Sequence, residues 1–202
     1  MISAIVLAAG ASQRMGCPKL LLPLGDKLVI EHVVHTVTAT NVDEAIVVVG
    51  HWRAEMEQVL AGLPVRVAFN PDYARGEMLS SVQVGLKAAS PMATAALIAL
   101  GDQPQVSVAT MNRIAAALRG EDDRICLPIF GGRRGHPIGL PRRFWSEVLS
   151  IGQGGSLREV IRRHQDAIAE IPVPDDAILS DMDTLQEYAR LLAHVQLSGR
   201  IA

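Results

Sequence analysis

The chain has 202 residues, 49% of them hydrophobic and 20% charged, so it is too apolar for a disordered chain and long enough to bury a sizeable core. Its formal net charge is −2 and its aromatic content 3%, values that argue against a basic or base-stacking surface for nucleic acid. Two cysteines, Cys17 and Cys126, provide no disulfide framework and no multi-cysteine zinc site, and no apolar run is long enough to span a membrane. We therefore expect one domain, residues 1–202, in the reducing cytoplasm, without a nucleic-acid or membrane partner.

Short aliphatic runs alternate along the chain with segments whose apolar residues recur at helical spacing. Uninterrupted apolar runs of this length are typical of strands buried on both faces of a sheet. In chain order, the predicted elements are the strand Ile2–Ala8, the helix Val29–Thr40, the strand Ala45–Val49, the helix Ala54–Leu60, the strand Val65–Phe69, the helix Leu79–Ala89, the strand Ala95–Leu100, the helix Val108–Leu118, the strand Ile125–Ile129, the helices Arg143–Leu149 and Leu157–His164, the strand Ala167–Ile171 and the helix Leu185–Val195.

This alternation predicts a three-layer α/β fold with a mostly parallel sheet, one edge of which is mixed or antiparallel. The segment Gly131–Pro141, GGRRGHPIGLP, interrupts the alternation and is rich in glycine, proline and arginine. We interpret it as a functional loop with a short strand inside the same domain.

The most informative segment is Leu7–Leu22, LAAGASQRMGCPKLLL, where the first predicted strand gives way to a loop. Ligands of open α/β sheets bind at the carboxyl ends of strands, and glycines such as Gly10 and Gly16 let backbone N–H groups approach an anion. Arg14 offers a planar fork to phosphate oxygens, and Lys19 a mobile point charge. The loop therefore predicts a polyphosphate site; a glycine turn with two solvated cations is the alternative. Its spacing fits neither a Walker A loop nor the dinucleotide fingerprint.

Two acidic motifs follow later strands. Asp102, in the sequence GDQP after the fourth predicted strand, is well placed to hold Mg²⁺, although a turn or helix-capping role is an equally good interpretation. Asp181 and Asp183, in the sequence DMDT, fall on the same side of an extended segment and therefore point to one ion. Thr184 and Glu187 fit a capping box for the last helix, which does not explain the two aspartates.

Together these motifs resemble the MobA-like nucleotidyltransferases, and among them the molybdenum cofactor cytidylyltransferases. The resemblance rests on LAAGxSxRMGxxK, GDQP, RGHP and DxDT, in that order over nearly the whole chain. It implies a three-layer Rossmann-like nucleotidyltransferase fold that binds a nucleoside triphosphate with Mg²⁺, or with Mn²⁺ in its place. It also implies the reaction, in which CMP passes from CTP to the phosphate of the molybdenum cofactor and pyrophosphate leaves.

The resemblance assigns roles residue by residue, although Ser80 and Ser81 cannot be told apart and neither can Asp181 and Asp183. The expected nucleotide contacts are Ala8, Ala9, Gly10, Arg14, Lys19, Asn70, Gly76, Ser80, Ser81 and Asp102. The expected metal ligands are Asp102, Asp183 and Asp181, the expected acceptor contacts are Arg134 and His136, and the expected catalytic residues are Arg14, Lys19 and Asp102.

Ala9 bears on the choice of base. The guanylyltransferase branch of the family has glycine at this place, giving LAGG, whereas this chain reads LAAG. A methyl group where the base rests on the loop narrows the pocket, which predicts a preference for CTP over GTP of about 10–200-fold. In the alternative, Ala9 points into the sheet and never meets the base.

Two other functions stay open. One is transfer to a different phosphorylated acceptor, such as a sugar phosphate or methylerythritol phosphate; GDQP and RGHP together favour the molybdenum cofactor. The other is a non-catalytic protein that binds this cofactor and delivers it to a molybdenum hydroxylase. An intact set of Arg14, Lys19 and Asp102 argues against the second function, because a pure carrier needs no triphosphate site. Transient contact with a hydroxylase is also expected of the enzyme.

Overall fold

The strands form one mixed sheet with a small hairpin beside it, in a computed structural model that describes residues 1–75, 78–120 and 122–198. The order of the sheet is β10-β7-β9-β6-β1-β4-β5, and β8 pairs with β7. The separate hairpin consists of β2 and β3. The strands are β1 (Ile2–Ala8), β2 (Pro23–Leu24), β3 (Lys27–Leu28), β4 (Glu44–Val49), β5 (Arg66–Phe69), β6 (Ala95–Leu100), β7 (Ile125–Phe130), β8 (Arg133–Arg134), β9 (Ile138–Pro141) and β10 (Ile168–Pro172).

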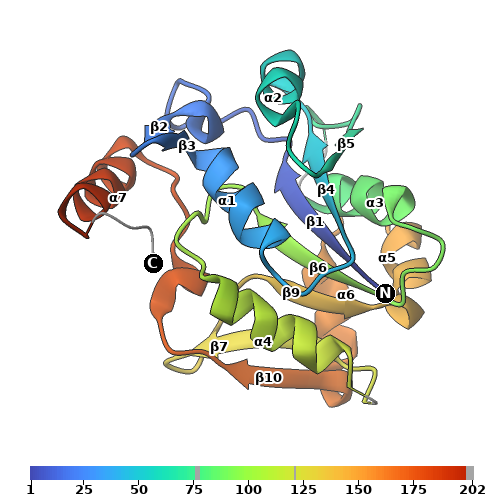
Figure 1. The fold of residues 1–202 in the computed structure, drawn as a ribbon. Coiled ribbons are helices and arrows are strands. Elements are labelled where there is room, and N and C mark those ends of the chain that lie inside the picture. The colour runs from blue at the N-terminus through green and yellow to red at the C-terminus, as the bar shows by residue number, and fades with distance from the viewer. Residues whose placement is uncertain (76–77, 121, 199–202) are drawn as a thin grey trace.

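Helices cover both faces of the sheet and so complete three layers. In Figure 1, α1 and α4 lie over one face, and α3, α5 and α6 lie over the other. The helices are α1 (Val29–Thr38), α2 (Arg53–Leu60), α3 (Met78–Ala88), α4 (Val108–Leu118), α5 (Trp145–Ser150), α6 (Leu157–Arg163) and α7 (Leu185–Ser198). Not one of them, within the described ranges, has the length and apolarity needed to cross a membrane.

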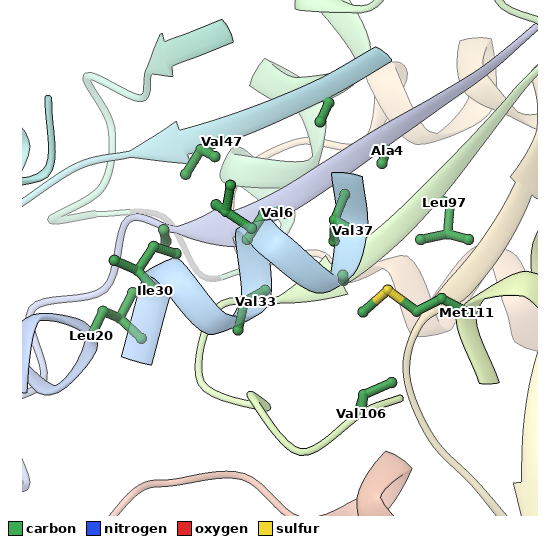
Figure 2. Close-up of a cluster of buried hydrophobic side chains, with 14 of the residues drawn as sticks. Ala4, Val6, Leu20, Ile30, Val33, Val37, Val47, Leu97, Val106 and Met111 are labelled. Carbon is green, nitrogen blue, oxygen red and sulfur yellow. The ribbon is translucent and has the colours of Figure 1, made fainter. Parts of the chain in front are cut away.

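β1 lies inside the sheet, between β4 and β6, and its residues alternate between the two helical layers. On one side, Val6 packs in a cluster with Val33 and Val37 of α1, as Figure 2 shows. On the other side, Ile5 packs in a cluster with Val82 of α3. Gly85 brings α3 close, because a Cβ at this position would lie 2.3 Å from Cγ2 of Ile5. The C-terminal half of α3 is therefore held tightly over the middle of β1.

The predicted α/β architecture is confirmed. β1 is parallel to both β4 and β6, whereas β9 is antiparallel to β6 and β7, so the sheet is mostly parallel with a mixed region. Every predicted strand and helix is present with shifts of a few residues at its ends; the helix predicted to end at Thr40, for example, ends at Thr38. The β2–β3 hairpin was not predicted, since strands of two residues are too short to show a periodic pattern.

Candidate active site

A cleft opens at the carboxyl ends of β1 and β6. Its inner part is a cavity of about 340 Å³ that reaches from Leu7–Gly10 to Asp102 and the segment Asp181–Asp183. An outer cavity of about 660 Å³ follows the loop from Gly10 to Lys19. The two cavities share lining residues and form one elongated site. This is the place where an open α/β sheet is expected to bind its ligand.

The loop after β1 is folded around Ser12. Its carbonyl oxygen accepts hydrogen bonds from the backbone N–H groups of Met15, at 3.0 Å, and Gly16, at 3.2 Å. Its hydroxyl accepts from the N–H of Lys19 at 3.3 Å. Ser12 has a φ of +53°, in the left-handed region that a non-glycine residue rarely adopts, and Gly16 has a φ of +66°. The sequence motif contains Ser12 but gave it no role; in the structure it sets the path of the loop that carries Arg14 and Lys19 into the cleft.

Lys19 lies between two carboxylates that come from distant parts of the chain. Its Nζ is 2.5 Å from Oδ2 of Asp102 and 2.8 Å from Oδ1 of Asp183. Nη2 of Arg14 lies 2.8 Å from the other oxygen of Asp183. The loop after β1, the loop after β6 and the segment before α7 therefore meet at one charged cluster.

Burial and the neighbouring charges shift the pKa values of Lys19 and Asp183 in opposite directions. Burial alone would lower the pKa of Lys19, but the charges and hydrogen bonds of Asp102 and Asp183 outweigh it and raise that pKa above its ordinary value. Burial likewise would raise the pKa of Asp183, but Lys19 and Arg14 outweigh it and lower that pKa. Both shifts favour the charged forms, so the ion pairs persist at neutral pH.

Asp102 belongs to the cleft and does not cap a helix. The N-cap of α4 is Ser107, whose hydroxyl accepts from the N–H of Thr110 at 3.1 Å. The backbone carbonyl of Asp102 instead accepts from the N–H of Met182 at 3.1 Å. The loop after β6 is thus joined directly to the segment that holds Asp181 and Asp183.

The segment Asp181–Asp183 alternates as an extended chain does. Asp181 and Asp183 line the cleft, whereas Met182 between them is 2% exposed and packs in the core. The pKa of Asp181 is raised, first by burial and then by the negative charge of Asp102. Glu187 accepts hydrogen bonds from the N–H groups of Asp183 and Thr184, which anchors the segment at the start of α7.

The carboxylates fit a divalent metal that a nucleotide brings with it. Hard oxygen ligands and adjacent negative charges suit Mg²⁺ or Mn²⁺, and the carboxylates of Asp102, Asp181 and Asp183 line one cavity. Among the described residues, no group of three or more His, Cys, Asp and Glu has the arrangement of a metal site. A protein that holds Mg²⁺ through one or two carboxylates and leaves the remaining positions to phosphates and water needs no such group.

Asn70 does not line the cleft, but it holds two serines, one of which does, by hydrogen bonds. Its side chain is fully buried, and its Nδ2 donates to Oγ of Ser80 at 2.9 Å and to Oγ of Ser81 at 3.0 Å. Ser81 lines the inner cavity, whereas Ser80 lines a separate cavity between α3 and the loop after α5. The structure thus separates two serines that the sequence left equivalent. Gly76 lies outside the described residues.

Tyr73 lines both parts of the cleft, although no sequence motif pointed to it. Ala9 lines the inner part, but its methyl group faces Gly50, where an added Cβ would lie 2.8 Å from the Cβ of Ala9. The carbonyl of Ala9 accepts from the N–H of His51 at 3.2 Å. This placement favours the alternative in which Ala9 never meets the base, and it joins the loop to the residues that follow β4.

The two residues expected at the acceptor have different surroundings. The N–H of His136 donates to the carbonyl of Ile178 at 3.1 Å, and Gly135 permits this close approach, since its Cβ would lie 2.1 Å from that carbonyl oxygen. Burial lowers the pKa of His136 to about 4, although the charge of Asp102 acts on it in the opposite direction, so the imidazole is neutral at neutral pH. Arg134 instead pairs with Glu170 at 2.7 Å, on β10, and does not line the cleft.

Comparison with known proteins gives a consistent family and fold. The model of the MobA-like NTP transferase domain matches residues 4–168. Nicotine blue oxidoreductase of Paenarthrobacter nicotinovorans is 31% identical over 201 residues, which are 95% of this chain and 96% of that protein.

Solved structures match over almost the whole chain. A nucleotidyl transferase from Methanothermobacter thermautotroptrophicus superposes with a TM-score of 0.84 at 30% identity, covering 98% of this chain and 99% of the other. Rv0371c of Mycobacterium tuberculosis H37Rv, in complex with manganese, superposes with a TM-score of 0.78 at 28% identity, covering 95% and 98%.

Proposed function

Because the chain belongs to the MobA-like NTP transferase domain family, we propose that it transfers CMP from CTP to the phosphate of the molybdenum cofactor and releases pyrophosphate. The observation that carries this proposal is the convergence of two cations, Arg14 and Lys19, with the carboxylates of Asp102 and Asp183 in one cleft. Cations bind a triphosphate and carboxylates hold its metal, so this set suits nucleotidyl transfer. We place the reaction in the cytoplasm, with Mg²⁺ as the metal.

In the proposed reaction, an oxygen of the acceptor phosphate attacks the α-phosphorus of CTP. A new phosphorus–oxygen bond forms, the bond to the β-phosphate bridge oxygen breaks, and pyrophosphate leaves with that electron pair. The acceptor supplies the nucleophile, so no serine, cysteine or lysine of the chain needs to attack. The protein contributes position and charge, and Arg14 and Lys19 stabilise the negative charge that gathers on the phosphates.

When bound, the divalent metal supplies positive charge between the carboxylates and the phosphate oxygens. Asp102 and one or both of Asp181 and Asp183 would hold it. Lys19 then donates from Nζ to the triphosphate in place of the carboxylates. His136, which is neutral and joined to Ile178 through its N–H, would lie on the acceptor side of the reacting phosphorus. The manganese complex of the similar Mycobacterium protein supports a divalent metal in this fold.

The test is incubation of the full chain with CTP labelled at the α-phosphate, Mg²⁺ and purified molybdenum cofactor. We expect equal amounts of pyrophosphate and labelled dinucleotide cofactor. A sugar phosphate or methylerythritol phosphate in place of the cofactor tests the other acceptors. Tight binding of the cofactor without pyrophosphate release would support the carrier function and contradict the proposal.

Asp102→Asn tests the metal role of this residue, because asparagine keeps the shape of the side chain and removes its charge. We expect it to lower the rate of pyrophosphate release by about two to three orders of magnitude, as deletion of a single stabilising group does. A variant with the rate and Mg²⁺ dependence of the unmutated chain would place the metal elsewhere.

An oxidoreductase is the second candidate, and the likeness to nicotine blue oxidoreductase over 95% of the chain favours it. Such a reaction needs an electron donor, and a reduced nicotinamide dinucleotide is the one to test, although the loop after β1 lacks the dinucleotide fingerprint. Consumption of that dinucleotide in the presence of nicotine blue, with no pyrophosphate released from CTP, would favour this candidate over the first.

A further inference from the structure

A side cavity lies next to the cleft, along the first turn of α3. It has a volume of about 240 Å³ and is enclosed by α3, the turn after β5 and the loop after α5. Ser80 lines it, whereas the adjacent Ser81 lines the cleft, and Nδ2 of Asn70 donates to both hydroxyls. The two spaces therefore adjoin the same helical turn, and one extended ligand can reach from the cleft into the side cavity. Its lining residues include Asp72, Arg75 and Gln83.

Gln83 fixes the wall of the side cavity. Its Nε2 donates to the backbone carbonyls of Val148 and Ile151, both at 2.9 Å, and so ties α3 to the end of α5. These two bonds use both hydrogens of the amide, so the oxygen is the group that Gln83 has left for a ligand. Leu79 and Ile151 add apolar surface. A small, fixed pocket that combines apolar surface with a few polar groups suits a flat, polar-edged ring.

Two opposite charges line the side cavity without neutralising each other. Asp72 and Arg75 belong to one turn, in which the N–H of Arg75 donates to the carbonyl of Asp72 at 3.0 Å. Both side chains are exposed, and neither forms an ion pair with any residue that the structure describes. A carboxylate accepts two parallel N–H groups, and a guanidinium donates to a carbonyl oxygen. The pair therefore suits a ring that carries two adjacent donors and a carbonyl oxygen beside them.

A pterin has this edge, whereas cytosine does not. In the amino-oxo-pyrimidine ring of a pterin, the 2-amino group and the neighbouring ring N–H are adjacent donors, and the 4-oxo group is the acceptor beside them. Cytosine has one donor group with two acceptors next to it, so its edge would turn a lone pair toward the carboxylate of Asp72. The acceptor of the proposed reaction contains a pterin, and the charges of the side cavity are complementary to it.

We infer that the side cavity is the subsite for the pterin ring of the acceptor, with Asp72 accepting from the two donors of the ring and Arg75 donating to its 4-oxo group. The phosphate of the same acceptor then lies in the cleft, beyond Ser81, where the triphosphate binds. The inference rests on the proposed function for the identity of the acceptor. It goes beyond that function by assigning residues to a part of the acceptor that does not react.

Binding of 6-hydroxymethylpterin to the full chain, without CTP or metal, tests the subsite. Equilibrium dialysis separates free from bound pterin, and its fluorescence measures both. We expect Asp72→Asn to weaken binding by about tenfold, because the amide replaces one accepting oxygen with a donor, and Arg75→Gln to weaken it by about threefold or more. Asp166→Asn removes another exposed carboxylate, just before β10 and outside the side cavity, and should change nothing.

Three results of this measurement overturn the assignment. They are an unmutated chain that does not bind the pterin, an Asp72→Asn variant that binds it as well as the unmutated chain does, and equal losses in Asp72→Asn and Asp166→Asn. Unchanged binding in Arg75→Gln would overturn the part assigned to Arg75.

Competition decides which ring the side cavity takes. Saturating CTP should leave the pterin bound, since the nucleotide occupies the cleft. Guanosine has the same adjacent donors as a pterin and should compete with it, whereas cytidine should not. Displacement of the pterin by CTP or by cytidine would assign the side cavity to the base of the nucleotide. GTP that displaces it more strongly than guanosine does would assign the cavity to a guanine nucleotide, and either result overturns the inference.

The transfer reaction separates this inference from the proposed function. Asp72→Asn should raise the KM for the molybdenum cofactor by about tenfold and leave the KM for CTP unchanged. A higher KM for CTP alone would mean that the turn supports the cleft, and would overturn the subsite. Pterin binding through Asp72 without any release of pyrophosphate would refute the proposed function and keep the subsite. Release of pyrophosphate with an unchanged KM for the cofactor in Asp72→Asn would do the reverse.

Discussion

The surroundings of Lys19 in the structure show that its substitution should affect stability as well as nucleotide binding. The sequence suggests a mobile point charge, or in the alternative a solvated cation, but its side chain is 13% exposed and lies between two carboxylates. Removing one partner of a partly buried ion pair leaves the other charge without compensation. In this cluster, removal of Lys19 leaves Asp102, Asp181 and Asp183 facing one another.

Lys19→Ala should therefore weaken CTP binding, nearly abolish turnover and also lower the melting temperature. Because a divalent cation can replace the lost charge, millimolar Mg²⁺ should recover more of the melting temperature in this variant than in the unmutated chain. Thermal unfolding with and without Mg²⁺ measures this, and Lys87→Ala, on the exposed surface of α3, is the control. A variant with unchanged CTP affinity would contradict the phosphate role of Lys19.

Ala9 gives a second residue-scale prediction, on the choice of base. Since its methyl group faces Gly50, its removal should not widen the place where a base binds. In a competition assay with equal CTP and GTP, Ala9→Gly should keep the selectivity of the unmutated chain. A shift toward GTP of about tenfold or more would instead support the direct steric role expected from the sequence. A preference of the unmutated chain for GTP would contradict the cytidylyl assignment.

At the scale of elements, α3 connects packing to the site, because the helix that carries Ser81 into the cleft rests on β1 through Gly85. Gly85→Ala would force a methyl group to within 2.3 Å of Ile5. Overpacking of this kind costs about 1–3 kcal/mol and shifts the backbone, so both the free energy of unfolding and the affinity for CTP should fall. Denaturant titration and calorimetry measure the two effects. Gly152→Ala is the matched control, since no atom lies within 4 Å of its added Cβ.

The helices and long strands could be predicted from the sequence because each long strand is a continuous apolar run and each helix has an apolar face. The alternation of Asp181 and Asp183 could be predicted for a similar reason, since an extended chain has a fixed period. The partners of side chains in loops could not be predicted. Arg134 and His136 are two residues apart in one motif, yet Arg134 pairs with Glu170 while His136 is buried and its N–H donates to the carbonyl of Ile178. Asn70 and Ser12 act through hydrogen bonds that no local spacing specifies.

At the scale of the whole molecule, stability should depend on pH through His136. Burial lowers its pKa from 6.5 to about 4, so the unfolded chain binds a proton in a pH range where the folded chain does not. The free energy of unfolding therefore falls as the pH falls from about 6.5 to about 4, and the contribution of a neutral His136 is fully present above that range. Urea titrations across this range should show a flatter dependence in His136→Asn. An equal slope in both chains would contradict the burial of a neutral imidazole.

Because the ribosome makes the chain from its N-terminus, the charged cluster of the cleft is completed late in synthesis. Lys19 and Asp183 are 164 positions apart, and they are brought together at the carboxyl ends of β1 and β6. A nascent chain can form the polyphosphate loop early in synthesis, but Lys19 pairs with Asp102 alone until Asp183 emerges. The complete charged cluster is thus a late event in biogenesis, and a fragment cut before Asp181 would keep every strand of the sheet while losing two of the three carboxylates of the cleft.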